Sequence, residues 1–419
     1  MRFDVIIIGG GLAGYACGIK LATAGQYCAL VSAGQGALHF SSGSFDFLGS
    51  LPDGEPVECP AAALPLLAAQ SPCHPYALLG AADCLALARE AEELLAASGV
   101  AMCGSIERNH LRLTPFGLLA PSWLSAPEVP VANFGEVLPW KKVAIVNIEG
   151  FLDFYPEILA ERLRDMGAET SLGSLGLPAL NRLRENPSEF RSVNIAQALN
   201  SPENFNQLTD GLKKFAENSD VLFLPACLGL RDPNVAAILG KRLSKPVRLI
   251  PTLPPSLIGA RINHILAQRF RALGGVIMPG DTVLRGEIGD GKVEKIYTAN
   301  HEDIPLTAGN YVLTSGSFFS KGLQAEQTGI REPVFGLDVT AASAQREEWT
   351  AKSVFAPQPY ASFGVEIDAS LRGQIGGAAI DNLYVAGMIL GHCDAIRQGC
   401  GAGVSLVSAL AVARGILAG

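Results

Sequence analysis

The chain opens with an apolar run, a glycine turn and a second apolar run. Residues 3–8 (FDVIII) are apolar except for one aspartate, which predicts a strand buried on both faces. The turn GGGLAG follows, then an apolar helix over residues 12–23 that Gly25 ends. Residues 27–31 predict a second strand. This order indicates a β-α-β unit of the Rossmann type, with a parallel sheet.

The same pattern returns in the second half of the chain. A helix, LIGARINHILAQRFRALGG, begins near Ser256, and a strand ends in TSG at Gly316. A further strand over residues 383–386 precedes a glycine-rich turn and a final helix. These segments complete one parallel sheet, because strands that alternate with helices are typical of that architecture.

The residues between these segments follow a different pattern. They contain helical stretches at 82–98 and 154–166, with proline-rich joints between them. We therefore predict an α/β fold in which a discontinuous Rossmann-type domain carries an inserted α+β cap. The Rossmann-type domain is expected over residues 1–58, 252–332 and 376–419, and the cap, for substrate or partner binding, over 59–251 and 333–375.

Composition narrows the class of protein. Hydrophobic residues make up 48% of the 419 residues and charged residues 17%, which favours large buried cores over disorder. The net charge of -8 disfavours a nucleic-acid-modifying enzyme. The nine cysteines include no C-x-x-C pair, so we expect reduced thiols and no iron–sulfur cluster. No membrane-spanning helix is expected, because the apolar stretch 404–416 is short and Arg414 interrupts it.

The first turn carries the G-x-G-x-x-G spacing of Gly9, Gly11 and Gly14. In this motif the first glycine permits the tight turn, the second admits a phosphate, and the third lets helix pack on strand. The following helix presents its positive N-terminal end to the anion. Such a turn also occurs in ordinary α/β proteins, but its place between strand and helix favours a dinucleotide site. One feature departs from the motif: Ser32 stands where a carboxylate usually holds the ribose.

The segment GALHFSSGSFD, residues 36–46, is the second candidate site. Ser41, Ser42 and Gly43 offer hydroxyls and unhindered backbone to a phosphate or a ring edge, and His39 is a candidate proton carrier. The alternative is a solvated serine-rich loop with a structural histidine.

The turn before the last helix is the third candidate. Gly399 and Gly401 open that helix, whose N–H groups can face developing negative charge. His392 and Arg397 lie beside the turn, with a binding role or a structural one equally open. For Asp394 we expect a capping role.

These segments resemble a known family. The glycine fingerprint, the loop LHFSSGSFDFLGSLPDG, the strand ending in TSG and the QGCGAG turn are similar to the B subunits of anaerobic glycerol-3-phosphate dehydrogenases over nearly the whole chain. The resemblance implies a heterotrimer, with an A-type catalytic flavoprotein and a C-type iron–sulfur subunit at the membrane. It implies oxidation of sn-glycerol 3-phosphate to dihydroxyacetone phosphate, with electrons passed to quinone and then to fumarate or nitrate.

The resemblance also implies a flavin, which in this family's B subunit is FMN, with FAD as the alternative. The absence of a carboxylate at Ser32 also favours FMN, because it weakens the binding of the AMP half of FAD. Met388 follows Gly387 where flavoproteins often have an acidic residue. The residues expected to contact the flavin are Gly9, Gly11, Gly14, Ser32, Ser41, Ser42, Gly43, Gly316, Gly387, Gly399 and Gly401.

Two functions follow for the chain itself. In the first, it oxidises substrate, with His39 or His392 as the base and Arg397 stabilising negative charge. In the second, it is a flavin-bearing relay or assembly subunit whose partner does the substrate chemistry. In both, we expect a cytoplasmic chain held on the inner face of the cell membrane through its partners.

Overall fold

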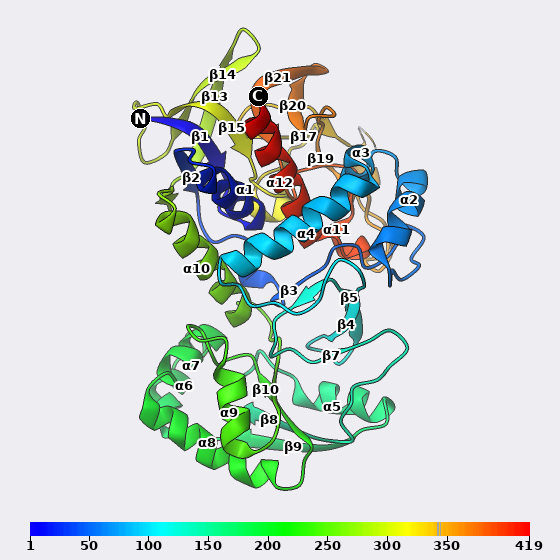
Figure 1. The fold of residues 1–419 in the computed structure, drawn as a ribbon, viewed down its shortest axis with the longest axis vertical. Helices are drawn as coiled ribbons and strands as arrows, with labels where there is room; N and C mark the ends of the chain where they lie inside the picture. The colour runs from blue at the N-terminus through cyan, green and yellow to red at the C-terminus, as the bar shows by residue number, and fades with distance from the viewer. Residues whose placement is uncertain (342, 344) are drawn as a thin grey trace.

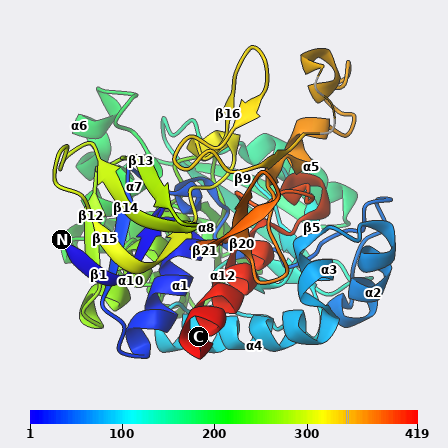
Figure 2. The same ribbon diagram turned by 90° about the horizontal axis from the view of Figure 1, so that it is seen from above.

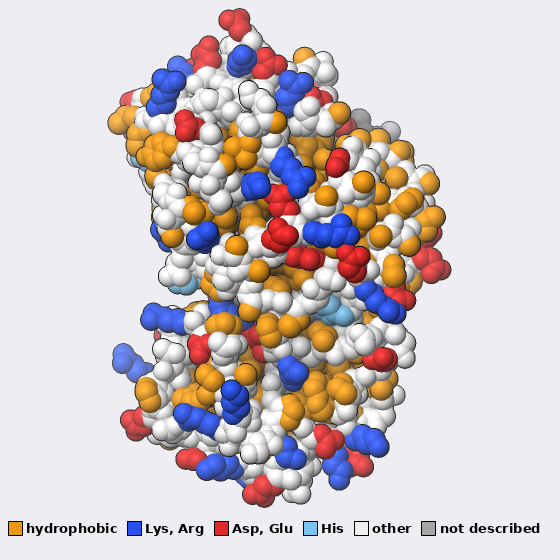
Figure 3. Space-filling model, viewed as in Figure 1, with side chains coloured by type: hydrophobic (Ala, Val, Ile, Leu, Met, Phe, Trp, Pro, Cys, Tyr) orange, Lys and Arg blue, Asp and Glu red, His pale blue; other side chains and the backbone are white. Residues whose placement is uncertain are grey.

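The computed structural model describes residues 1–341, 343 and 345–419. Figure 1 shows two stacked bodies: the upper one holds both termini, and the lower one is built around a second sheet. Small antiparallel strands and loops join the two bodies. Figure 3, in the same view, shows basic and acidic side chains interspersed over this face of both bodies.

The upper body is organised around a six-stranded sheet in which five neighbouring strands are parallel. Its order is β12 (Val276–Pro279), β2 (Cys28–Ser32), β1 (Arg2–Ile8), β15 (Thr307–Leu313), β21 (Ala378–Val385) and the antiparallel β20 (Arg372–Ile375). Ile8 pairs with Val31 on one side and with Leu313 on the other, so the carboxyl ends of the central strands lie together. Loops that follow these ends therefore share one edge of the sheet.

Both faces of this sheet are covered, which is why Val5, Ile6 and Ile7 are fully buried. The helices α1 (Leu12–Thr23), α12 (Gly401–Ala418), α4 (Ala81–Ala97) and α10 (Leu257–Ala272) pack together as one layer. The hairpin of β13 (Val283–Gly289) and β14 (Lys292–Thr298) packs on β15 and β21. The parallel sheet of the Rossmann-type fold expected from the sequence is therefore present.

Helix α12 is the centre of the helical layer. It is the one helix, among the residues described, that is long and apolar enough to cross a membrane. Figure 2 shows it beside α1 and α4, and its side chains Val404, Val407 and Leu410 are fully buried there. Arg414 pairs with Glu90 of α4. The apolar composition of α12 is thus explained by burial in the core, as the sequence predicts.

Helix α4 shows where the expected domain division differs from the packing. Residues 60–97, grouped with the cap on sequence, form α2 (Pro60–Gln70), α3 (Pro75–Leu79) and α4, and these pack on one another and on α12. The apolar face of α4, with Leu87, Ala91 and Leu95, faces the upper body. An amphipathic helix shows which face is buried, but not which body covers that face.

The lower body has its own parallel sheet, in the order β11-β10-β8-β9. Its elements are β8 (Lys142–Ile148), α5 (Pro156–Asp165), β9 (Glu169–Leu175), α6 (Asn181–Arg184), α7 (Ser192–Ala198), α8 (Pro202–Ala216), β10 (Val221–Pro225), α9 (Val235–Leu243) and β11 (Val247–Ile250). Val221, Leu222 and Phe223 of β10 are fully buried.

Short strands occupy the junction. β3 (Ser44–Phe45) pairs with β6 (Leu124–Ser125), and β4 (His110–Leu113) pairs with β5 (Leu119–Ser122) and β7 (Val131–Ala132). The other short strands are β16 (Gln324–Ala325), β17 (Ile330–Arg331), β18 (Val339–Thr340) and β19 (Gly364–Val365), and α11 (Ala395–Gln398) is a single helical turn. β3 places residues of the upper body's serine-rich loop directly against the junction.

Candidate functional site

The glycine turn after β1 has the geometry of a phosphate cradle. Gly9 has φ +123°, and a Cβ built on it would lie 2.2 Å from the carbonyl oxygen of Thr314. A Cβ on Gly14 would lie 2.0 Å from the carbonyl oxygen of Gly9. A Cβ on Gly11 would meet no atom within 4 Å. Gly9 and Gly14 are therefore required for packing, whereas Gly11 leaves open space at the helix N-terminus, as a phosphate needs.

A cavity of about 570 Å³ continues from this turn along the carboxyl ends of the strands. Its lining includes Gly10, Ser32, Gly36, Asn263, Arg271 and Pro279. The Ser32 hydroxyl donates to the carbonyl of Gly34, 2.8 Å away. Within the described residues no carboxylate lines the cavity, and the buried Oδ1 of Asn263 has no hydrogen-bond partner. Sequence reasoning missed Asn263, because it lies on the distant helix α10 and outside any motif.

The serine-rich loop is held by its own hydroxyls. Ser41 Oγ donates to the carbonyl of Leu38 at 2.9 Å, and Ser42 Oγ accepts from the amide of Ser44 at 3.3 Å. Gly43 has φ +81°, and a Cβ there would lie 2.2 Å from Ile258 of α10. Gly43 thus permits the loop to approach α10, and the two serines stabilise the turn.

His39 lies in the same loop and lines the cavity. Its Nδ1 is 3.4 Å from the carbonyl oxygen of Gly36. Burial lowers the pKa of this histidine, while that backbone contact acts in the opposite direction. A neutral imidazole beside the cavity is able to accept a proton.

The turn before α12 lies against the loop after β3. The amide of Gly403 donates to the carbonyl of Asp46 at 2.9 Å, and the amide of Gly49 donates to the carbonyl of Gln398 at 2.8 Å. Gly399 has φ +55°, and a Cβ on Gly401 would meet nothing closer than 3.5 Å. Backbone hydrogen bonds therefore join the end of the serine-rich segment to the turn at the start of α12.

Other predicted residues at this edge are explained by packing. Asp394 accepts from the amides of Ile396 and Arg397, so its expected capping role is confirmed. Gly387 has φ +83°, and a Cβ there would lie 2.8 Å from that of Ala13 in α1. Gly316 has φ +79° in the loop that follows β15.

The three residues predicted to be catalytic have separate surroundings. His392, at φ +64°, places Nε2 at 3.3 Å from Glu366 Oε2 and 3.1 Å from Thr340 Oγ1. The side chain of Arg397 is exposed, and no hydrogen bond joins it to a described residue. His39 lines the cavity instead. Contacts within the described chain do not unite these residues, and their roles stay predictions.

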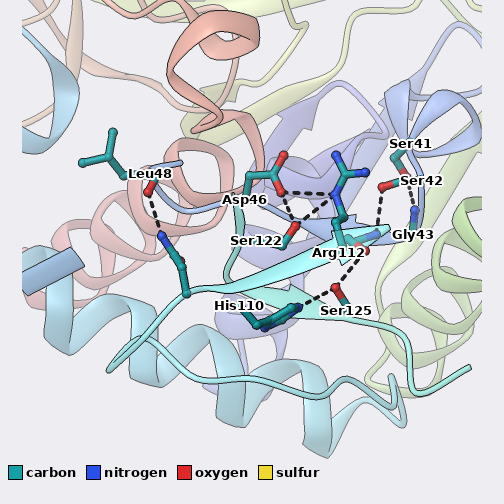
Figure 4. A network of polar contacts seen from close by, with 11 residues as sticks. Ser41, Ser42, Gly43, Asp46, Leu48, His110, Arg112, Ser122 and Ser125 are labelled. Carbon is teal, nitrogen blue, oxygen red and sulfur yellow. Dashed lines mark hydrogen bonds and ion pairs between the residues drawn. The ribbon is translucent and has the colours of Figure 1, made fainter. Parts of the chain in front are cut away.

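Figure 4 shows a polar network at the junction that sequence reasoning missed. Ser122 Oγ donates to Asp46 Oδ1 at 2.6 Å, and Arg112 Nε donates to Ser122 Oγ at 3.0 Å. Burial raises the pKa of Asp46, which Arg112 and Ser122 partly offset. The sequence feature that could have indicated this network is the alternation of side chains along β4, which places His110 and Arg112 on the same face of the strand.

His110 forms a second line of contacts beside the first. Its Nε2 lies 2.7 Å from Ser125 Oγ, and Ser125 donates to Ser44 Oγ at 2.9 Å. Burial, and then the charge of Arg112, lower the pKa of His110. The network therefore carries polar contacts from β4 to the serine-rich loop.

Comparison with known proteins identifies the family. A family model described as an FAD binding domain matches residues 4–404. The B subunit of anaerobic glycerol-3-phosphate dehydrogenase from Yersinia enterocolitica is 51% identical over 418 residues, which cover 100% of this chain and 98% of the relative. The chain belongs to this B-subunit family. The same subunit of Pectobacterium carotovorum is 50% identical over 422 residues, with 100% and 99% covered, and that of Actinobacillus succinogenes is 46% identical over 421 residues, with 99% and 98% covered.

Membership of the B-subunit family confirms the resemblance expected from the sequence. It makes the chain a flavin-binding oxidoreductase subunit, in agreement with the glycine cradle and the parallel sheet. The subunit designation of the relatives also implies a complex of several chains.

Proposed function

We propose that this chain is the flavin-bearing subunit of a complex that oxidises sn-glycerol 3-phosphate to dihydroxyacetone phosphate. The observation that carries the proposal is the 51% identity over the full length of a B subunit so named. The open space at Gly11 and the adjoining cavity support a bound dinucleotide. A bound flavin supplies a hydride acceptor to this chemistry.

The residues of this chain would then bind and orient the substrate and take its proton. Oxidation of the C2 alcohol removes a hydride from C2 and a proton from the hydroxyl. His39 and His392 are the proposed bases, and Arg397 the group that stabilises negative charge. His392 is supported by Glu366, whose Oε2 lies 3.3 Å from its Nε2, because a neighbouring carboxylate orients an imidazole. His392→Asn and His39→Asn in the assembled complex test this assignment, and turnover near wild type in both variants would remove it.

For the cofactor we favour FAD, where the sequence alone favoured FMN. The family model is that of an FAD binding domain, and the cavity extends past the glycine turn to β12, where an AMP half would lie. The orphaned Oδ1 of Asn263 is a candidate acceptor for a ribose or adenine group. Acid denaturation of the pure chain releases the flavin, and chromatography of the supernatant identifies it. One FMN released per chain would contradict the assignment of FAD.

The partners proposed are an A-type flavoprotein and a C-type iron–sulfur subunit, through which electrons reach quinone and then fumarate or nitrate. The chain would be cytoplasmic and held at the inner face of the cell membrane by these partners. The second candidate function is a relay or assembly subunit. Anaerobic mixing of the isolated flavin-loaded chain with sn-glycerol 3-phosphate separates the two: loss of the flavin's visible absorbance supports oxidation by this chain, and unchanged absorbance supports the relay.

A further inference from the structure

Arg112 is a largely buried cation with unused hydrogen-bonding capacity. Its side chain is 16% exposed. Nε donates to Ser122 Oγ at 3.0 Å, and no hydrogen bond joins either terminal nitrogen to a described residue. Neither terminal nitrogen is fully buried, so each keeps some contact with solvent. Since a guanidinium carries five N–H donors, most of its capacity remains available.

The negative charge beside Arg112 only partly balances it. Asp46 Oδ1 lies 3.8 Å from Nε, beyond hydrogen-bond distance, and accepts instead from Ser122. Burial raises the pKa of Asp46, while Arg112 and Ser122 act in the opposite direction. The arrangement fixes the guanidinium through Nε while leaving its terminal N–H groups for an anion.

Asp46 connects Arg112 to the turn at the start of α12. The backbone carbonyl of Asp46 accepts from the amide of Gly403 in the first turn of α12 at 2.9 Å. Figure 4 shows the guanidinium between Asp46 and the loop of Ser41 and Ser42, with its terminal nitrogens directed away from β4. Arg112 thus extends from the junction to the edge where the serine-rich loop and α12 meet.

We propose that Arg112 binds the phosphate of the substrate, with Asp46 and Ser122 as positioning residues. This inference rests on the proposed function and assigns a substrate-binding group to it. The planar guanidinium presents paired N–H groups that match two oxygens of a phosphate monoester. Other arginines fit less well: Arg397 is exposed, Arg271 lines the cofactor cavity, and Arg261 is paired with buried Glu128.

The test compares Arg112→Ala and Arg112→Lys with Arg108→Ala in the assembled complex. Arg108 is the matched control because it precedes the same strand, is 64% exposed and pairs with Glu58 at the surface. We expect Arg112→Ala to raise KM for sn-glycerol 3-phosphate roughly tenfold to a hundredfold, as loss of charged hydrogen bonds does. The KM of Arg112→Lys should lie between those of wild type and Arg112→Ala, because lysine keeps the positive charge but lacks the paired N–H groups of the guanidinium. Flavin content and Arg108→Ala should match wild type.

Inhibition by inorganic phosphate is the second readout. Its inhibition constant should rise in Arg112→Ala by a factor similar to KM, whereas a merely structural role would leave it unchanged. KM and phosphate inhibition within about twofold of wild type in both variants would overturn the assignment. Loss of flavin from both variants would also overturn it, since Arg112 would then serve the cofactor. If Arg112→Ala does not fold, Arg112→Lys decides. A wild-type complex without turnover would instead reject the proposed function.

Discussion

The buried ion pair of Arg261 and Glu128 joins α10 of the upper body to the junction, and we expect the stability of the protein to depend strongly on it. Arg261 belongs to α10, and its side chain is 5% exposed, while that of Glu128 is 2% exposed. Arg261 Nη1 also donates to the carbonyl of Gly229 at 2.8 Å. Replacing Arg261 with Met removes the counter-charge and leaves the carboxylate of Glu128 inside the protein.

The expected cost follows from burial. Breaking a buried ion pair by removing one partner destabilises a protein by about 3–5 kcal/mol, because the remaining charge is desolvated without compensation. Glu128 Oε2 already has no hydrogen-bond partner, so the carboxylate is incompletely satisfied even in the wild type. The double variant Arg261→Met, Glu128→Leu removes both charges, and should recover most of the loss.

Urea unfolding followed by circular dichroism measures these differences. The matched control is Arg89→Ala, since Arg89 and Glu107 form an exposed pair, 51% and 65% exposed, and such pairs contribute less than about 1 kcal/mol. A loss below about 1 kcal/mol in Arg261→Met would refute the reasoning. A double variant no more stable than Arg261→Met would show that packing, rather than the orphaned charge, dominates.

The glycine cradle, a buried histidine and the attachment to partners each carry a further prediction. Gly11→Ala should reduce flavin content at least about tenfold while the apo chain keeps its melting temperature, because the methyl enters open space; Gly415→Ala, which also meets no atom within 4 Å, should retain full flavin. Burial lowers the pKa of His74 from 6.5 to about 3. As the pH falls below 6.5, the unfolded chain therefore binds a proton on this histidine that the folded chain does not bind, and the free energy of unfolding decreases. The loss should be about 2 kcal/mol between pH 6.5 and about pH 5, and urea unfolding of His74→Asn should lack this component. In cells without the partner subunits, fractionation should recover the chain in the supernatant, and firm attachment to membranes would contradict attachment through partners.

The local elements and the cofactor turn are readable from the residue pattern alone. Apolar runs of the right length predicted β1, β2 and β15, and the spacing of Gly9, Gly11 and Gly14 predicted the tight turn between β1 and α1. The apolar pattern of α12 predicted a buried helix, with charge only near its end. These features are predictable because local periodicity and glycine conformation depend on residues that are close in the chain.

Which distant residues share a site depends instead on how separate elements pack. Asp46 ends the serine-rich segment, whereas Ser122 lies 76 positions away and outside any motif, yet their side chains are hydrogen-bonded. Arg261 and Glu128 are likewise hydrogen-bonded although they are 133 positions apart. In the sequence they are two charged residues with nothing to indicate that they pair. Burial and pairing of such groups arise only in the folded chain, since periodicity along one strand or helix identifies a buried face without identifying its partner.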